Sequence, residues 1–500
     1  MNRQWIKQLG LGLFVAIPVS VPVVAKENVK VHPNVIFILL DDYGYTDLGC
    51  YGSKFYETPN IDRLASEGVR FTNGYATCPV SSPSRSSIMT GKYPVRTGVT
   101  DWIPGRQAES GGLPQDKWLA EPFQTHMALE ETTIAEALHA NGYATMISGK
   151  WHLGETEQFW PEAQGFDVNK GGYNAGSPNK GKNSNGYFSP YGNPRLEDGP
   201  VGEYLTDRQT DEALKFIGSH QANPFYVYLS YYAVHNPMQG KEALIEKFKQ
   251  KAISMGIADK ERFTKDKDWI KQAPKGDFKE RLIQNDPVYA AMIYSVDENI
   301  GRLLAFLKEK KLYDNTIIVF TSDNGGLSTA EGSPTTNAPL RAGKGWLYEG
   351  GIRVPLIIRI PDSKVKNVEN NTPVCGIDFY PTLLDCAGIS SDQMQVDGIS
   401  LLPLLKNGKL SERPLFWHYP HYSNQGGDPG SAVRLGKYKL IDNFETGKQE
   451  LYDLEKDISE TTDLAESNPQ KVKEFYKILN DWRLRNHAKM MTPNPNFKNE

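Results

Sequence analysis

A serine-rich stretch of the chain combines a candidate nucleophile with a nearby cation. Pro83 suits the first position of a helix and Gly91 suits its end, so the sequence predicts a short helix over residues 83–90. Ser81 then precedes the helix N-terminus, where free N–H groups and the helix dipole favour an anion. Arg85 adds a positive charge in the first turn. The arrangement suits a nucleophile for an anionic ester, although a capped serine–proline loop has the same local pattern.

Polar and ionisable side chains follow four predicted strands. The strands are apolar runs typical of buried parallel sheets, and they span residues 34–40, 143–148, 225–231 and 316–321. In an open α/β sheet, ligands bind at the carboxyl ends of the strands. Together with the Ser81 turn, one site is therefore predicted to contain Asp41, Asp42, Lys150, His152, His235, Asp323 and Asn324. Each alone could be a helix cap or a structural residue, but their occurrence at one edge favours a shared site.

Two of these strand ends supply oxygen ligands for a metal ion. Asp41 and Asp42 are adjacent, and two such carboxylates behind a buried strand repel each other unless a cation lies between them. Asp323 and Asn324 add further oxygen atoms. Hard oxygen ligands without Cys or His favour Ca²⁺ or Mg²⁺ over Zn²⁺. The sequence therefore predicts a hard divalent cation at this edge of the sheet.

The stretch that begins at Ser81 resembles the signature of a known enzyme family. Residues 81–85 read Ser-Ser-Pro-Ser-Arg and a Thr-Gly pair follows at 90–91, as in the Cys/Ser-x-Pro-Ser-Arg signature of the type I sulfatases, members of the alkaline-phosphatase-like superfamily. The resemblance implies that a dedicated maturase oxidises Ser81 to formylglycine, whose hydrated aldehyde attacks a sulfate ester. This chain is of the Ser type, whereas many relatives have Cys. Cys78 lies outside the motif and is a poor candidate for the conversion.

The same resemblance implies the metal shell. Two Asp after the first strand and a later Asp-Asn pair hold a divalent ion in this family. The corresponding residues here are Asp41, Asp42, Asp323 and Asn324, and the formylglycine from Ser81 completes the shell. The ion is usually calcium, so Ca²⁺ is expected in preference to Mg²⁺.

The resemblance also implies which cations and acid–base groups act on the substrate. A second segment, from Lys344 to Pro355, resembles the family pattern Lys-x₄-Glu-Gly-Gly-x-Arg-x-Pro. By this resemblance Lys150 and Lys344 bind the sulfate, and His235 donates a proton to the leaving sugar oxygen, which suits an imidazole. The remaining two expected catalytic residues, Arg85 and His152, support the hydrated aldehyde. Arg341 is expected to contact substrate, and Arg353 to have a structural role.

The N-terminus predicts export. A basic start is followed by an apolar run over residues 9–24, and the small residues before Lys26 suit cleavage near Ala25. A signal peptide over residues 1–25 and a periplasmic or secreted mature protein are therefore expected. The alternative is an uncleaved anchor, but the run is interrupted by proline and short for a membrane span, so no stable membrane insertion is expected. The net charge of −4 argues against a nucleic-acid partner, and four cysteines are too few for a disulfide scaffold.

The element pattern predicts an α/β fold with a large, mostly parallel central sheet flanked by helices, as in the alkaline-phosphatase and sulfatase group. The predicted divisions are a catalytic domain over 26–408 and a smaller subdomain of antiparallel sheet plus helix over 409–500. A loop rich in Gly, Asn and Tyr, residues 171–200, is expected near the mouth of the site. Its Tyr173, Tyr187 and Tyr191 are candidates for contact with sugar.

These observations predict an exported sulfatase that hydrolyses sulfate monoesters on carbohydrates during glycan degradation. One alternative is a phosphate- or phosphonate-ester hydrolase of the same superfamily that uses unmodified Ser81. Another is a non-catalytic protein that binds sulfated glycans. The motif around Ser81 disfavours the first alternative, and the retention of the full polar set disfavours the second.

Overall fold

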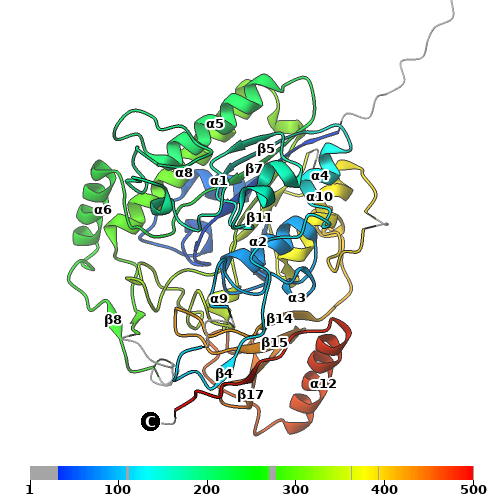
Figure 1. The fold of residues 1–500 in the computed structure, drawn as a ribbon. Helices are drawn as coiled ribbons and strands as arrows, with labels where there is room; N and C mark the ends of the chain where they lie inside the picture. The colour runs from blue at the N-terminus through cyan, green and yellow to red at the C-terminus, as the bar shows by residue number, and fades with distance from the viewer. Residues whose placement is uncertain are drawn as a thin grey trace, which may run out of the picture. The chain divides into compact units, whose positions relative to one another are not determined.

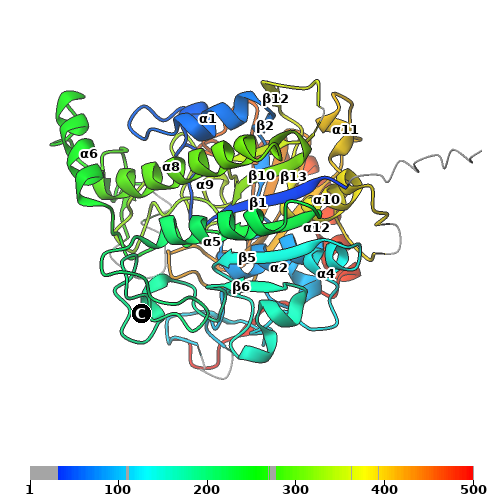
Figure 2. The same cartoon turned by 90° about the horizontal axis from the view of Figure 1, so that it is seen from above.

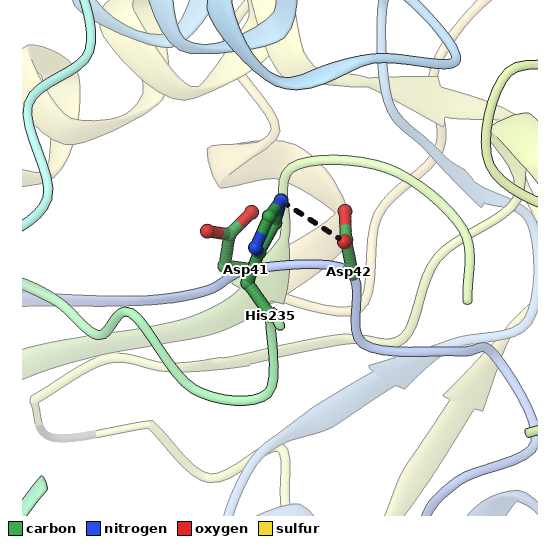
Figure 3. Close-up of side chains that lie close together, drawn as sticks. All are labelled: Asp41, Asp42 and His235. Carbon is green, nitrogen blue, oxygen red and sulfur yellow. Dashed lines mark ion pairs between the residues drawn. The ribbon is translucent and has the colours of Figure 1, made fainter. Parts of the chain in front are cut away.

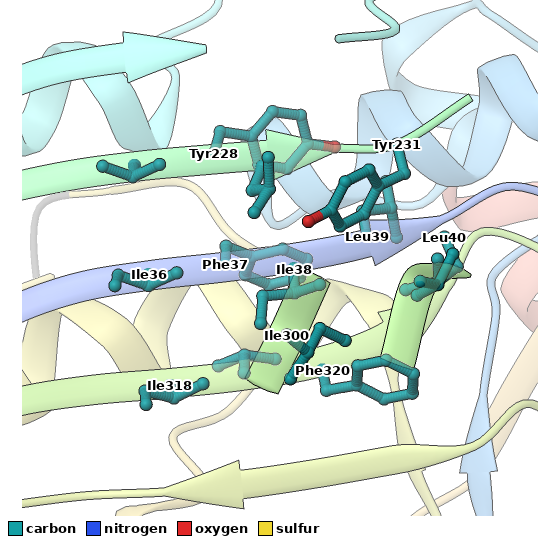
Figure 4. Packing of buried hydrophobic residues seen from close by; sticks show 14 of the residues in the cluster. Ile36, Phe37, Ile38, Leu39, Leu40, Tyr228, Tyr231, Ile300, Ile318 and Phe320 are labelled. Carbon is teal, nitrogen blue, oxygen red and sulfur yellow. The ribbon is translucent and has the colours of Figure 1, made fainter. Parts of the chain in front are cut away.

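The strand β1 (Asn34–Leu40) lies in the middle of the central sheet, and its apolar residues are fully buried. In this computed structural model it pairs in parallel with β7 (Phe225–Ser230) on one side and β10 (Thr316–Ser322) on the other. Figure 4 shows the side chains of these strands packed together with Ile300 of the helix α8 (Pro287–Glu309). A strand buried on both faces explains why residues 34–40 form an unbroken apolar run.

The structure describes residues 32–107, 112–267, 270, 278–361, 363–391 and 394–498. The predicted signal peptide lies outside these residues. Within the described part of the chain, no helix combines the length and the apolar character needed to cross a membrane.

The central sheet has eight strands in the order β12-β2-β11-β10-β1-β7-β5-β6. The outer five are β5 (Ala144–Gly149), β6 (Val168–Lys170), β11 (Leu356–Arg359), β2 (Val69–Phe71) and β12 (Val368–Asn370). The strand β11 runs antiparallel to both of its neighbours, and the other pairings are parallel. The chain leaves this sheet after β2, and the next short strand, β3 (Gly74–Tyr75), pairs with β13 (Val374–Cys375).

Helices cover both faces of the sheet (Figures 1 and 2). One layer contains α8 with α1 (Pro59–Ser66), α5 (Leu205–Ser219) and α6 (Glu242–Ser254). The other contains α2 (Ser81–Thr90), α4 (Ile134–His139) and α10 (Phe379–Ala387). Local signals fix some of these ends, since a capping box formed by Thr133 and Glu136 opens α4.

A separate antiparallel sheet follows in the C-terminal part of the chain. Its strands are β14 (Leu415–Tyr419), β15 (Gly430–Leu435), β16 (Tyr438–Asn443) and β17 (Lys448–Asp453). The helix α12 (Pro469–Arg485) packs on this sheet, where the rings of Phe416 and Trp482 stack with centroids 4.7 Å apart. This arrangement confirms the predicted fold class. The division of the chain at residue 408 remains a prediction.

Short elements complete the structure. Two-stranded pairs are formed by β4 (Trp118–Leu119) with β18 (Thr492–Pro493) and by β8 (Phe263–Thr264) with β9 (Glu280–Arg281). The short helices are α3 (Pro94–Thr97), α9 (Glu349–Ile352) and α11 (Leu402–Leu405). The helix α9 follows Lys344 and is tied to the C-terminal sheet, because Lys439 of β16 forms buried ion pairs with Glu349 and Glu460 at 3.0 and 2.8 Å.

Candidate active site

The four strands predicted to carry polar residues are neighbours in the sheet. They lie in the order β10-β1-β7-β5 and run in parallel, so their carboxyl ends meet at one edge. The structure thereby brings together ten of the predicted site residues: Asp41, Asp42, Ser81, Arg85, Lys150, His152, His235, Asp323, Asn324 and Lys344.

Asp41 and Asp42 are held by the loops that follow the neighbouring strands. The backbone N–H of Asp42 donates to Asp323 Oδ1 at 3.2 Å, and Asn324 Nδ2 donates to Asp42 Oδ1 at 2.8 Å. Asp42 has a φ of 59°, an uncommon value for a residue with a side chain, and it turns the chain sharply after β1. The backbone of Asp41 bonds to that of Ala233 after β7. These contacts bring the acidic side chains of two strand ends together.

The helix α2 begins at Ser81 rather than at Pro83. The predicted start was two residues late, because Ser82 does not cap the helix; its hydroxyl donates to the carbonyl of His152 at 2.9 Å and accepts from the N–H of Ile103 at 3.1 Å. Ser81 is buried, with 3% of its surface exposed. Its Oγ lies 3.2 Å from Asp41 Oδ1 and 3.4 Å from Asn324 Oδ1. The first helical residue therefore faces the acidic side chains directly.

Each of three acidic residues in the site is paired with a buried cation. The distances are 2.7 Å for Lys150 Nζ to Asp41 Oδ2, 2.8 Å for Lys344 Nζ to Asp42 Oδ2, and 2.8 Å for Arg85 Nη2 to Asp323 Oδ2. Lys150 Nζ also lies 3.3 Å from Ser81 Oγ. The side chains of the three carboxylates are no more than 3% exposed, and those of the three cations no more than 8%. The site is therefore a buried cluster in which each of these three carboxylates is paired with a cation.

Burial and pairing act in opposite directions on the carboxylates. Burial raises the pKa of Asp41 to about 7 even though Lys150 favours its charged form. For Asp42, burial also disfavours the charge, but Lys344 and His235 outweigh it and hold the pKa below its usual value. Burial of Asp323 is likewise outweighed, by Arg85 and Lys150, so its pKa is lowered. In all three carboxylates, therefore, the neighbouring cations favour the charged form and burial opposes it.

His235 reaches the same cluster from the loop after β7. Its Nε2 lies 3.6 Å from Asp42 Oδ2 (Figure 3). The same atom lies 3.2 Å from Lys344 Nζ. Its Nδ1 lies 3.0 Å from the carbonyl of Asn236, and because a carbonyl only accepts, Nδ1 carries the proton. Burial and the charge of Lys344 lower the pKa of His235 to about 4. Its Nε2 is therefore a free-base nitrogen directed at the site.

His152 is fixed in place by its backbone and its neighbours. It has a φ of 58°, and its Nε2 lies 2.5 Å from the carbonyl of Ile103. The ring packs against Gly176, where an added Cβ would lie 2.6 Å from the ring atom Cε1, so position 176 has no room for a side chain. Burial and Lys150 lower the pKa of His152 well below its usual value. The imidazole is therefore neutral and tightly positioned beside the cleft.

A cleft of about 630 Å³ opens above these residues. The sequence did not identify most of its other lining residues, which include Trp102, Asn174, Lys180, Glu331, Asn424 and Gln425. The only signal for any of them was the composition of the 171–200 loop, which correctly indicated the mouth of the site. Glu331 and the 424–425 pair lie far from the motifs in sequence, so no local pattern identifies them.

Two sets of residues predicted to contact substrate lie outside the lining of the cleft. Arg341 lies outside the cleft; its Nη1 donates to the hydroxyl of Tyr452 at 3.1 Å and to the carbonyl of Glu460 at 2.8 Å. Its guanidinium also stacks 3.7 Å from the centroid of the Tyr348 ring. The chain reverses at Ala342, which has a φ of 61°, and this turn directs Arg341 to the C-terminal sheet while Lys344 enters the site.

The three tyrosines proposed for sugar contact belong to the core. Tyr173, Tyr187 and Tyr191 are at most 5% exposed. The hydroxyl of Tyr187 donates to the carbonyls of Tyr232 and His235 at 2.7 and 2.8 Å. These side chains hold the loop in position beneath the cleft and do not line it. Arg353, by contrast, has the predicted structural place, in a 2.8 Å ion pair with buried Glu349.

The oxygen atoms of the site fit a hard metal ion. Asp41, Asp42, Asp323 and Asn324 supply carboxylate and amide oxygens, and the Ser81 hydroxyl lies among them. Candidate ligand atoms of Asp41, Asp42 and His235 lie within 4.8 Å of one another. Ligand sets dominated by oxygen are those preferred by Ca²⁺ and Mg²⁺. The acidic cluster is therefore a candidate metal site.

Comparisons with known proteins agree with this geometry. Residues 33–389 match the Sulfatase family, and residues 342–486 match the family described as N-sulphoglucosamine sulphohydrolase, C-terminal. The N-acetylgalactosamine-6-sulfatase of Canis lupus familiaris is 32% identical over 81% of this chain and 71% of its own length. A sulfatase of Formosa agariphila is 30% identical over 97% of this chain and 95% of its own.

Solved structures show the same fold. The structure of Ps i-CgsB in complex with k-i-k-neocarrahexaose has a TM-score of 0.72 and 29% identity, over 94% of this chain and 95% of that one. The match to the Sulfatase family covers more than half of this chain and contains every residue of the strand-end cluster. The chain belongs to the sulfatase family, a group of sulfate-ester hydrolases within the alkaline-phosphatase-like superfamily.

Proposed function

We propose that this protein is an exported glycan sulfatase that hydrolyses sulfate monoesters on carbohydrates, with formylglycine at Ser81 and Ca²⁺ at the acidic cluster. The observation that carries the proposal is the position of Ser81. Its buried Oγ lies within 3.4 Å of Asp41, Asn324 and Lys150, at the start of a helix whose Arg85 is also in the site. An oxygen nucleophile is thereby surrounded by metal ligands and by fixed positive charge.

The residues present fit both groups that the proposal requires. Ser81 stands first in the family signature, and the four residues with oxygen ligands around it match a hard cation better than Zn²⁺. Asp41, Asp42, Ser81, Asp323 and Asn324 would hold the ion. When bound, the formylglycine supplies a geminal-diol nucleophile, and Ca²⁺ supplies positive charge that favours its deprotonated form.

The lysines bind the transferred group. Lys150 and Lys344 are buried ammonium groups at the floor of the cleft, where a sulfate ester with its single negative charge would enter. Charge-assisted hydrogen bonds to sulfate oxygens orient the ester and become more favourable as charge shifts to its oxygens. Arg85 is directed instead at Asp323 and at the carbonyl of Lys150, so it orients the site from below.

The histidines move protons. His235 Nε2 lies in the cleft 3.2 Å from Lys344 Nζ, and it is the atom that would carry a proton to the leaving sugar oxygen. A bound sulfate favours the charged imidazole, which raises the pKa from its value in the free site. His152 also lines the cleft and is neutral, and its Nδ1 has no hydrogen-bond partner among the described residues, so this atom would accept a proton from the group at Ser81.

The carbohydrate assignment rests on the relatives. Two proteins with similar sequences or structures are named for carbohydrate ligands, an N-acetylgalactosamine-6-sulfatase and a complex with a neocarrahexaose. The cleft volume of about 630 Å³ and its amide and aromatic lining suit a sugar ring. The basic and apolar N-terminal residues support export, which would give the enzyme access to external glycans.

Peptide mass spectrometry tests the nucleophile. Trypsin releases residues 71–85 from protein purified from the native host, and fragment ions should place a loss of two hydrogens, or an aldehyde adduct, at Ser81. The converted protein should release sulfate from at least one member of a panel of sulfated sugars. Ser81→Ala should abolish that release, whereas Cys78→Ser, a matched change outside the motif, should retain it. Unmodified serine together with turnover of phosphate esters alone would support the phosphatase alternative instead.

A further inference from the structure

One acidic side chain lines the cleft in a place that a sulfate-binding site does not need. Among the described residues that line the cleft, Glu331 is the one carboxylate, and it is exposed to the cleft solvent. The floor of the same cleft is cationic, with Lys150 and Lys344. A carboxylate at the wall of an anion site weakens binding of the anion, so its presence calls for another ligand group.

The turn that presents Glu331 is held in an unusual conformation. Three successive residues have positive φ: Glu331 at 53°, Gly332 at 89° and Ser333 at 41°. For residues with side chains this conformation is unfavourable and persists only where the surroundings impose it. Buried Arg281 imposes it here, because its Nη1 donates to the carbonyl of Ser333 at 3.0 Å. The direction of Glu331 is therefore fixed by the fold.

Neighbouring contacts place Glu331 beside the loop of His235, the proposed proton donor to the leaving sugar. Asn236, the residue after His235, donates to the carbonyl of Glu331 at 3.1 Å. The amide of Gln425 donates to Glu331 Oε1. The second carboxylate oxygen of Glu331, Oε2, lies at the long distance of 3.5 Å from Asn236 Nδ2.

We propose that Glu331 selects the sugar by accepting hydrogen bonds from a free hydroxyl next to the sulfate ester, and that it rejects a ring with a second sulfate or a carboxylate at that place. A carboxylate only accepts hydrogen bonds, so it pairs with hydroxyl groups and repels a second anion. This inference rests on the proposed function. It implies that neighbouring anionic groups must be removed by another hydrolase before this enzyme acts on the ring.

A matched pair of substrates tests the inference. The pair consists of a monosulfated sugar that the wild type hydrolyses and the same sugar with a second sulfate on the adjacent hydroxyl. We expect kcat/KM of the wild type to be about 50-fold lower for the disulfated sugar, the factor that corresponds to like charges about 7 Å apart at an effective dielectric constant near 20. In Glu331→Gln, which keeps an oxygen to accept from Gln425, the ratio should fall at least tenfold, mainly through KM.

Controls separate this role from others. Glu130→Gln removes the charge of an exposed carboxylate outside the cleft and should leave the ratio unchanged. If Glu331 only balanced the charge of Lys344, its variant would lose kcat equally on both sugars, and an unchanged ratio would overturn the inference. Equal hydrolysis of both sugars by the wild type would overturn it as well and leave the sulfatase assignment intact. If no sulfated sugar in the panel releases sulfate, the proposed function itself is wrong.

Discussion

Replacement of Lys344 by alanine is the most direct test of the sulfate-binding floor. The ammonium group is 2.8 Å from Asp42 Oδ2 and 3.2 Å from His235 Nε2, and its side chain is 8% exposed. The variant loses one buried, charged donor to the sulfate. A hydrogen bond between charged partners contributes about 1.5–3 kcal/mol, and each 1.36 kcal/mol is a tenfold change in rate. We therefore expect kcat/KM for sulfate release to fall about 10- to 150-fold.

The assay must separate catalysis from folding, because the variant also leaves Asp42 without its partner. Far-UV circular dichroism should match the wild type, and Lys344→Gln, which retains an uncharged donor, should lose nearly as much activity as alanine. The control is Lys180→Ala, since Lys180 is an exposed lysine of the same cleft. Exposed charges are screened, so its loss should stay within about threefold. A Lys344→Ala enzyme that folds and retains the full rate would remove Lys344 from the site.

Three further outcomes follow from buried charges. Removal of the bound metal by a chelator should lower the midpoint of unfolding, and Ca²⁺ at a hundred times its Kd should raise the free energy of unfolding again by about 2.7 kcal/mol. If Ca²⁺ stabilised an Asp323→Asn variant by the same amount, Asp323 would not be a metal ligand. Burial lowers the pKa of His418 to about 4 in the folded protein. As the pH drops from about 6.5 to 4, this histidine therefore takes up a proton in the unfolded chain but not in the folded one, and the free energy of unfolding falls by up to about 3 kcal/mol. His418→Gln should lack this part of the pH dependence, and parallel curves of unfolding free energy against pH would contradict the argument. Lys439→Met leaves Glu349 and Glu460 buried without their shared cation and should cost about 3–5 kcal/mol in urea unfolding, whereas an unchanged midpoint would show that the pairs contribute no net stability.

The parts of the site that sequence could predict are those that follow a buried strand. The run 34–40 is apolar at every position after its first residue, so it indicates a strand with both faces covered, and the acidic pair after it must lie at a sheet edge. The same reasoning placed residues 150, 235 and 323 at that edge without any knowledge of strand order. Parallel strands bring their carboxyl ends together whatever their order, so the prediction did not depend on topology.

The parts that sequence could not predict depend on backbone reversals and distant contacts. Arg341 lies three residues before Lys344, yet the positive φ of Ala342 directs it to Tyr452 and Glu460, and nothing in an alanine indicates that conformation. Glu331 enters the cleft because buried Arg281 holds its turn from 50 residues away in the chain. The antiparallel direction of β11 was equally invisible, since a short apolar run is compatible with either direction.

The charge balance of the site links its stability to its chemistry. Three buried carboxylates face three buried cations, and the cost of burying each charge is offset only by its partner. A divalent cation that bound to the carboxylate oxygens would take over this compensation and leave Lys150 and Lys344 with unmatched positive charge, which a sulfate ester would then neutralise. The lysines that pair with the acidic cluster in the free protein would thus be the same groups that bind the substrate in the metal-loaded one. By linkage, the metal and the sulfate should each raise the affinity of the other by the same factor.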